Sequence, residues 1–261
     1  MPQSADGAAA ERTGLVLGVV GVVIFGLTLP MTRLAVLELD ALFVTLARAL
    51  IAAAIAAIVL GATRAKVPER RDWLRLAGFS LCVVLGFPLL MAMAMRTVPS
   101  SHGGVVLGVL PLLTTMASVV VAGERPSIAF WLCGIAGSAA VVAYALIAGV
   151  GSSALQPGDV LLAFSAISAA AGYALGGELS RRIGGWEVIS WALVLAAPLM
   201  ALLLLVLAPP INWGASAKAW AALGYVAVFS QFAGFFAWNK GLALGGIAKV
   251  GQTQLLQTFV T

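Results

Sequence analysis

The feature that most limits how this chain can fold is a succession of apolar runs, each long enough to cross a lipid bilayer. A spanning helix needs about 20 mainly apolar residues, because each residue rises about 1.5 Å through a hydrocarbon core of about 30 Å. Eight runs meet this requirement, and short polar or Gly/Pro-containing turns separate them. They predict helices near residues 13–34, 41–62, 73–95, 101–122, 127–149, 158–180, 187–208 and 217–240.

The composition excludes a soluble fold. Hydrophobic residues make up 62% of the 261 residues, charged residues only 10%, and the mean hydropathy is +1.07. A soluble domain carries about 25% charged residues, because its surface must face water. The outer surface of this chain must therefore face the lipid bilayer, and we predict an all-α integral membrane protein.

The positions of the basic residues predict the orientation of the bundle. With the N-terminus in the cytoplasm, eleven of the 15 basic residues lie at cytoplasmic helix ends and loops, and only Arg33, Arg96 and Lys218 lie outside. Cytoplasmic loops are enriched in Lys and Arg, so we predict a multi-pass protein of the cell inner (plasma) membrane. The scattering of these residues also argues against a nucleic-acid partner, despite the net charge of +5, because they form no basic patch.

A faint internal repeat relates the two halves of the chain at an offset near 147. The stretch MAMAMRTVPSSHGGVVLGVLPLLTT aligns with WNKGLALGGIAKVGQTQLLQTFVT, which pairs Gly104 with Gly251 and His102 with Lys249. The first predicted helix maps onto the sixth, so each repeat holds five helices. Because five is odd, the second repeat must be inverted in the membrane, a recurring plan of secondary transporters.

The repeat predicts how the chain is divided. Residues 1–150 form the first five-helix repeat, and residues 151–261 form the second, with its final helix missing. A ninth apolar run begins near Gly246 and is still running at Thr261. The same offset predicts a tenth helix beyond it. We therefore expect ten transmembrane helices in the full protein and about nine in this chain.

Several motifs resemble the drug/metabolite transporter superfamily, and among its families the EamA-type ten-helix exporters. They are Phe25-Gly26, the run TLARALIAAAIA around Arg48, VLPLLTTMASVVVAGERPS, and FAWNKGLALGGIAKVGQTQLLQ. Thr258 departs from the pattern, because it stands where the second repeat would usually carry a proline. Within the family, the chain is similar to the YddG-type aromatic amino-acid exporters. The resemblance implies efflux of amino acids or similar metabolites by alternating access.

Arg48 is the charged residue that lies deepest inside a predicted span. An arginine at the bilayer centre costs about 2.5–3.5 kcal/mol on insertion scales, so it must face protein or water. One interpretation is an anchor for a substrate carboxylate, which suits a planar bidentate donor. The other is a structural arginine that bonds to backbone carbonyls and fixes its helix against a neighbour.

Polar, aromatic and polarizable side chains inside the other spans complete the candidate central cavity. The side-chain amides in these spans either line the transport path or form hydrogen bonds between helices, each of which stabilises the bundle by about 0.6 kcal/mol on average. The lone histidine is either a proton relay or an interfacial residue, and a methionine run is adaptable to ligands or simply packs. The predicted substrate-binding set is Phe25, Thr28, Arg48, Met91, His102, Tyr173, Gln231, Trp238, Asn239, Gln254 and Gln257.

These patterns favour a secondary transporter that exports small metabolites from the cytoplasm, above all amino acids with aromatic or neutral side chains. A carrier for multiple drugs or other metabolites is the alternative. An enzyme is disfavoured, because no acid, base and nucleophile cluster within the spans, and a passive channel explains an inverted repeat less well. We expect no cofactor and no metal, since the sequence has one histidine and no Walker A motif, and a monomer or weak homodimer.

Overall fold

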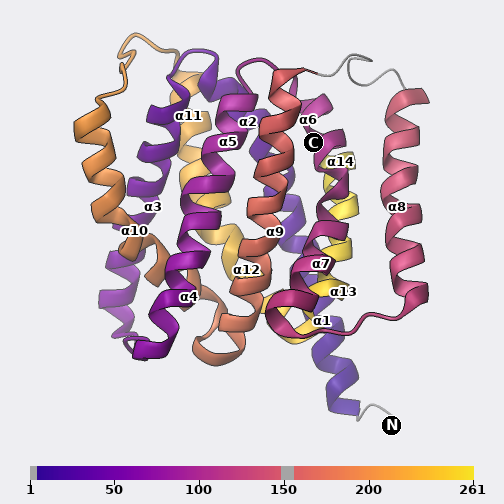
Figure 1. Ribbon diagram of the computed structural model, residues 1–261. Coiled ribbons are helices and arrows are strands. Elements are labelled where there is room, and N and C mark those ends of the chain that lie inside the picture. Colours follow the sequence, from indigo (N-terminus) through magenta and orange to yellow (C-terminus); the bar gives the residue numbers. More distant parts are fainter. Residues whose placement is uncertain (1–4, 148–155) are drawn as a thin grey trace.

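The computed structural model describes residues 5–147 and 156–261, and these residues form a bundle of helices without strands (Figure 1). Four irregular segments interrupt the helices: two π-helical turns, η1 (Leu81–Gly86) and η3 (Val226–Ala233), and two 3₁₀ turns, η2 (Leu107–Val109) and η4 (Gln252–Leu256). The α-helices are α1 (Ala5–Gly26), α2 (Thr28–Val36), α3 (Ala41–Thr63), α4 (Arg70–Ser80), α5 (Phe87–Ala94), α6 (Ser100–Val106), α7 (Leu110–Ala122), α8 (Ile128–Ile147), α9 (Pro157–Ile183), α10 (Gly185–Leu207), α11 (Ala217–Tyr225), α12 (Gly234–Gly245), α13 (Ile247–Gly251) and α14 (Gln257–Val260).

Seven helical stretches within the described ranges are long and apolar enough to span a membrane, and Ile128–Val141 of α8 is a further, shorter apolar stretch. The outward faces of the bundle are apolar: Val120, Leu205 and Ile58 each expose more than two thirds of their surface. Such side chains need lipid around them. The predicted all-α membrane fold is therefore confirmed. The spanning stretches are Gly7–Val36, Ala41–Thr63, Arg70–Ala94, Ser100–Ala122, Pro157–Ile183, Gly185–Leu207 and Ala217–Gly245.

Local sequence sets the ends of these helices. Asp40 is the N-cap of α3, and its carboxylate accepts hydrogen bonds from the amides of Leu42 (2.8 Å) and Phe43 (3.1 Å). The Ser216 hydroxyl caps α11 in the same way, accepting from Ala219 N at 3.3 Å. These caps satisfy amides that have no partner within the helix, so the polar turns of the sequence become the boundaries of the spans.

The two halves share their irregularities as well as their helices. The π turns η1 and η3, and likewise the 3₁₀ turns η2 and η4, lie at positions related by the offset near 147. Helix α1 starts at the end of the bundle that holds the N-terminus, whereas α9, its counterpart, starts at the opposite end (Figure 1). The repeat is therefore structural and inverted, as the odd helix number requires.

The ninth apolar run is helical but irregular. It consists of three short pieces, α13, η4 and α14, in which only the middle piece is 3₁₀. Gly246 begins this region with φ +84°, a conformation that L-residues with a side chain rarely adopt. The amide-rich sequence that follows packs against α7 and α1, and this packing decides its path.

Polar side-chain contacts link the helices at both ends of the bundle. At the end that holds the N-terminus, Glu124 accepts hydrogen bonds from the amides of Ile247 and Ala248, both at 2.8 Å, and Lys249 pairs with Glu11. At the opposite end, His102 Nε2 lies 2.7 Å from Asp159 Oδ1. His102 and Lys249 are repeat-related, and Glu11 and Asp159 lie within one residue of the same offset. The two pairs are therefore equivalents on opposite ends.

Candidate functional site

A narrow central cavity lies where both repeats meet. The space between its lining atoms is about 270 Å³. The first repeat contributes α1, α2, α3, the π turn η1 and the first residue of α5 to its walls. The second repeat contributes α9, the π turn η3, α12 and α14. The lining residues are Phe25, Thr28, Arg48, Val83, Phe87, Tyr173, Ser230, Gln231, Phe235 and Gln257.

Arg48 is the charged group of this cavity, and its side chain is 2% exposed. Its Nη2 donates to Ser230 Oγ at 3.1 Å, and that hydroxyl lies 2.8 Å from Thr28 Oγ1. Its Nε is buried and has no hydrogen-bond partner among the described residues. No described carboxylate forms an ion pair with it either. A buried cation without a counter-ion is costly, so an anionic group entering the cavity would be favoured.

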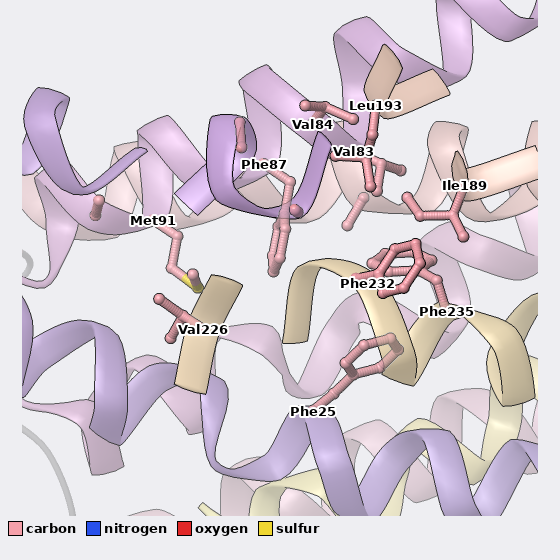
Figure 2. Close-up of a cluster of buried hydrophobic side chains, with 14 of the residues drawn as sticks. Phe25, Val83, Val84, Phe87, Met91, Ile189, Leu193, Val226, Phe232 and Phe235 are labelled. Atoms are coloured by element: carbon pink, nitrogen blue, oxygen red, sulfur yellow. The ribbon is translucent and has the colours of Figure 1, made fainter. Parts of the chain in front are cut away.

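Aromatic rings form the wall of the cavity toward the end that holds the N-terminus. The centroids of Phe25 and Phe235 are 5.0 Å apart, and those of Tyr173 and Trp238 are 5.2 Å apart. Figure 2 shows Phe25 and Phe235 turned toward each other, with Val83 and Phe87 above them. Tilted rings at these separations attract one another, and together they present an apolar surface beside the arginine.

The two π turns hold the cavity walls in place. Gln231 in η3 donates from Nε2 to the carbonyl oxygen of Val83 in η1 at 3.3 Å. A π turn widens the helix and leaves a backbone carbonyl without its usual helical donor. Here the side-chain amide of Gln231, from the second repeat, donates to that carbonyl. The two halves of the protein are thus joined by a hydrogen bond at mid-bundle, next to Arg48.

A second cavity adjoins the first, and Gln257 lines both. The space between its lining atoms is about 210 Å³. Each 3₁₀ turn contributes one lining residue, Leu107 from η2 and Gln254 from η4, and the neighbouring α-helices contribute most of the others. Its lining residues are Leu29, Gly104, Leu107, Leu110, Gln254, Gln257 and Thr261.

Both cavities are closed in this conformation. In each, the space open to a water-sized molecule is about 10 Å³, which is the room that one water needs. A metabolite requires several times that volume. In this conformation the central site therefore has no room for a metabolite, and polar contacts link the helices at both ends.

Two larger hollows lie elsewhere and have a different character. One is between α4 and α10, and the other between α7 and α9. Their linings are almost entirely apolar, including exposed Leu199 and Val120. Their apolar linings suit lipid chains rather than a polar metabolite. A further hollow, beside the connection between α2 and α3, is lined by polar residues that include Glu38, Asp40 and Arg96.

The structure brings six of the eleven predicted substrate-binding residues together in the first cavity, and Gln254 into the second. Trp238 lies behind the first cavity, against Tyr173. Three others lie elsewhere: Met91 is buried in the core, His102 pairs with Asp159 at the opposite end, and Asn239 donates to the carbonyl of Gly185 at 3.2 Å. The six are Phe25, Thr28, Arg48, Tyr173, Gln231 and Gln257.

Four lining residues of the first cavity escaped the sequence analysis: Val83, Phe87, Ser230 and Phe235. Three of them are apolar residues in apolar runs, so nothing marks them. Ser230 is one residue before Gln231, and a polar pair inside a span was a usable signal. No group of three or more His, Cys, Asp or Glu side chains suited to a metal gathers anywhere in residues 5–147 and 156–261.

Comparisons with known proteins agree with this architecture. The chain is 47% identical over 247 residues to "Uncharacterized transporter YdeK" of Bacillus subtilis (strain 168), covering 94% of this chain and 85% of the relative. A crystal structure of another protein, 20% identical, superposes with a TM-score of 0.71 over 95% of this chain and 86% of that one. The family profile described as "EamA-like transporter family" matches twice, over residues 12–146 and 156–261. This chain belongs to the EamA-like transporter family.

Proposed function

We propose that this protein exports small metabolites, above all amino acids with neutral or aromatic side chains, from the cytoplasm by alternating access. The observation that carries the proposal is Arg48, a buried cation with an unpartnered Nε and no counter-ion among the described residues. A substrate carboxylate would accept from the guanidinium and offset the cost of its burial. In this role Arg48 is a substrate-binding residue, rather than only a brace between helices.

The aromatic wall supports the same substrate class. Phe25, Tyr173 and Phe235 place apolar ring surface beside the arginine. A molecule with a carboxylate at one end and an uncharged side chain at the other matches both features. A multiply charged ligand would need several cations, and Arg48 is the cation among the described residues that line the cavity.

The orientation follows from the basic residues at the helix ends. Arg181, Arg182 and Arg75 lie at the end of the bundle that holds the N-terminus, within ion pairs to Glu124, Asp72 and Glu178 respectively. The positive-inside bias favours that end as cytoplasmic, in the cell inner membrane. Export, rather than uptake, is what the resemblance to EamA-type exporters implies.

The test is efflux from liposomes that contain the purified protein and a labelled mixture of threonine, leucine, glutamine, methionine and the aromatic amino acids. We expect saturable, selective loss. Arg48→Gln should raise KM by about 10- to 100-fold, because a hydrogen bond to a charged group is worth about 1.5–3 kcal/mol. Arg48→Lys should restore it only in part, since the planar fork is lost.

The exposed cation Lys218 provides the control, and Lys218→Gln should leave KM unchanged. If folded wild-type protein releases none of the amino acids, that substrate class is wrong, and other metabolites or apolar drugs take its place. If efflux occurs but Arg48→Gln and Lys218→Gln behave alike, the arginine is structural.

A further inference from the structure

The second cavity contains a polar group that nothing around it satisfies. Gln254 is 4% exposed, and both its Oε1 and its Nε2 are buried without a hydrogen-bond partner among the described residues. The other polar side chains of the same wall are engaged: Gln257 Nε2 donates to Phe25 O at 3.4 Å, and Thr261 Oγ1 donates to Gly26 O at 2.9 Å. An amide left unpaired in a membrane interior costs several kcal/mol, so its retention at this place calls for a partner.

The local backbone directs Gln254 into the cavity. It sits in the middle of η4, opposite η2, and both turns are 3₁₀ rather than α-helical. A 3₁₀ stretch in the middle of a helix often marks a functional site, and discontinuous helices form the substrate sites of many secondary transporters. A third irregularity, the break between α1 and α2 at Leu27, adjoins Leu29 of the same cavity.

The two walls of this cavity are repeat-related but chemically different. At the offset near 147, Leu107 corresponds to Gln254 and Leu110 to Gln257, and all four residues line the cavity. The cavity therefore straddles the axis that relates the repeats. The first repeat contributes an apolar wall, and the second contributes two primary amides.

We propose that Gln254 is a substrate-binding residue of a second subsite, which takes an uncharged polar end of the substrate. The subsite suits a group that both donates and accepts hydrogen bonds, a carboxamide foremost, because the glutamine amide offers one donor and one acceptor side. With Arg48 in the adjoining cavity, the favoured substrate is a small zwitterion with a carboxamide side chain. This inference rests on the proposed function for its carboxylate end.

The experiment compares glutamine with methionine, which has a similar length but no amide, in the liposome efflux assay. Gln254→Leu copies the residue that the first repeat carries. It should lower the ratio of the glutamine to the methionine efflux efficiency by about tenfold, the usual effect of losing one buried hydrogen-bonding partner. The thermal stability should stay equal or rise, because an unpaired buried amide is removed, so failure to fold is not expected.

Gln252→Leu is the matched control on the same turn. Gln252 Nε2 donates to Thr115 Oγ1 at 3.2 Å, toward α7. Loss of this hydrogen bond in Gln252→Leu should lower the thermal stability and leave the ratio of glutamine to methionine efflux efficiency unchanged. Equal ratios in wild type and Gln254→Leu, with efflux intact, would overturn the subsite while leaving the proposed function standing.

If wild-type protein transports no amino acid, a binding measurement tests the carboxamide subsite at Gln254 separately from the proposed export function. In that case the proposed function fails, and the subsite is judged by benzamide, a primary amide without a carboxylate. Benzamide should raise the melting temperature of wild type more than that of Gln254→Leu. Equal shifts, or no shift in either protein, would reject the subsite as well.

Discussion

At the scale of single residues, this bundle depends on positions where two backbones touch. A Cβ on Gly14 of α1 would lie 2.4 Å from the amide nitrogen of Gly245, and a Cβ on Gly241 would lie 2.9 Å from the carbonyl oxygen of Gly14. Such small-residue contacts let membrane helices approach closely and gain packing energy. The contact places α12, and hence Trp238, against α1 beneath the central cavity.

The glycine contact predicts a sharp difference between two chemically identical changes. Gly14→Ala should destabilise the protein by about 1–3 kcal/mol, since neither backbone can yield without moving a helix. Gly61→Ala in α3 meets no atom within 4 Å and should be neutral or slightly stabilising, because alanine favours helix over glycine. Thermal unfolding of both purified variants in one detergent checks this; equal melting temperatures would contradict it.

The sequence identified single residues where they break a pattern. Arg48 is visible because a charge interrupts an apolar run, and Gln254 and Gln257 because amides do. Val83 and Phe235 are ordinary apolar residues, and only the tertiary fold turns them toward Arg48. Their side chains carry no chemical mark that separates cavity lining from lipid contact.

At the scale of elements, the connection between α2 and α3 is fixed to the start of α11. The Glu38 carboxylate accepts hydrogen bonds from the backbone amide and the hydroxyl of Ser216, each at 2.6 Å. These bonds, the hydroxyl's first, hold the pKa of Glu38 below its ordinary value. Asn212 adds a bond from Nδ2 to Glu38 O at 3.2 Å. The carboxylate therefore joins the two repeats at the end opposite the N-terminus.

This contact should weaken in acid. Because the folded-state pKa of Glu38 is the lower one, its stabilisation is complete above the unfolded pKa, about 4.3, and is lost as pH falls through the folded-state value. Glu38→Gln should lower the melting temperature at pH 7, and the two proteins should converge as the pH falls through the folded-state pKa of Glu38. Melting curves across this range test the sign. A constant gap between the two proteins at every pH would contradict it.

Whole spans were predictable at this scale, but their interruptions were not. Bilayer thickness requires a minimum run of apolar residues, so seven of the eight predicted spans begin and end close to observed ones. The other, 127–149, coincides with α8, and its predicted end lies outside the described residues. The π turns η1 and η3 and the 3₁₀ turns η2 and η4 arise in apolar or amide-containing runs that suit an α-helix equally well. Packing between the repeats selects them, and that information is not local.

At the scale of the whole molecule, one polar side-chain pair links helices at each end of the bundle. His102–Asp159 joins α6 to α9 at the opposite end, and Glu11–Lys249 joins α1 to α13 at the end that holds the N-terminus. The central site is closed while both are formed. Alternating access requires that the helices separate at one end while they stay joined at the other.

Removing one pair should therefore favour opening at its own end. Asp159→Asn should speed the labelling of Thr28→Cys by a membrane-impermeant maleimide added at the end opposite the N-terminus. Glu11→Gln should speed the same labelling when the reagent is added at the end that holds the N-terminus. The Glu11–Lys249 pair is partly exposed and worth about 0–1 kcal/mol, so Glu11→Gln should change the labelling rate by up to about fivefold. His102 and Asp159 are both buried, so Asp159→Asn should have the larger effect. Cys82 and Cys133 are replaced by serine beforehand. The idea fails if both variants speed labelling from the same side.

The wall asymmetry of the second cavity has a consequence for how a ligand can lie in it. If the two repeats were identical, a site on the two-fold axis between them would bind an asymmetric ligand equally well in two opposite orientations. With Leu107 and Leu110 facing Gln254 and Gln257, the poses are no longer degenerate, and the statistical gain of RT ln 2, about 0.4 kcal/mol, disappears. If the proposed subsite binds the substrate, we expect the substrate to keep one orientation in it. The sequence difference between the two repeats thus makes the two orientations of a bound ligand unequal in binding free energy.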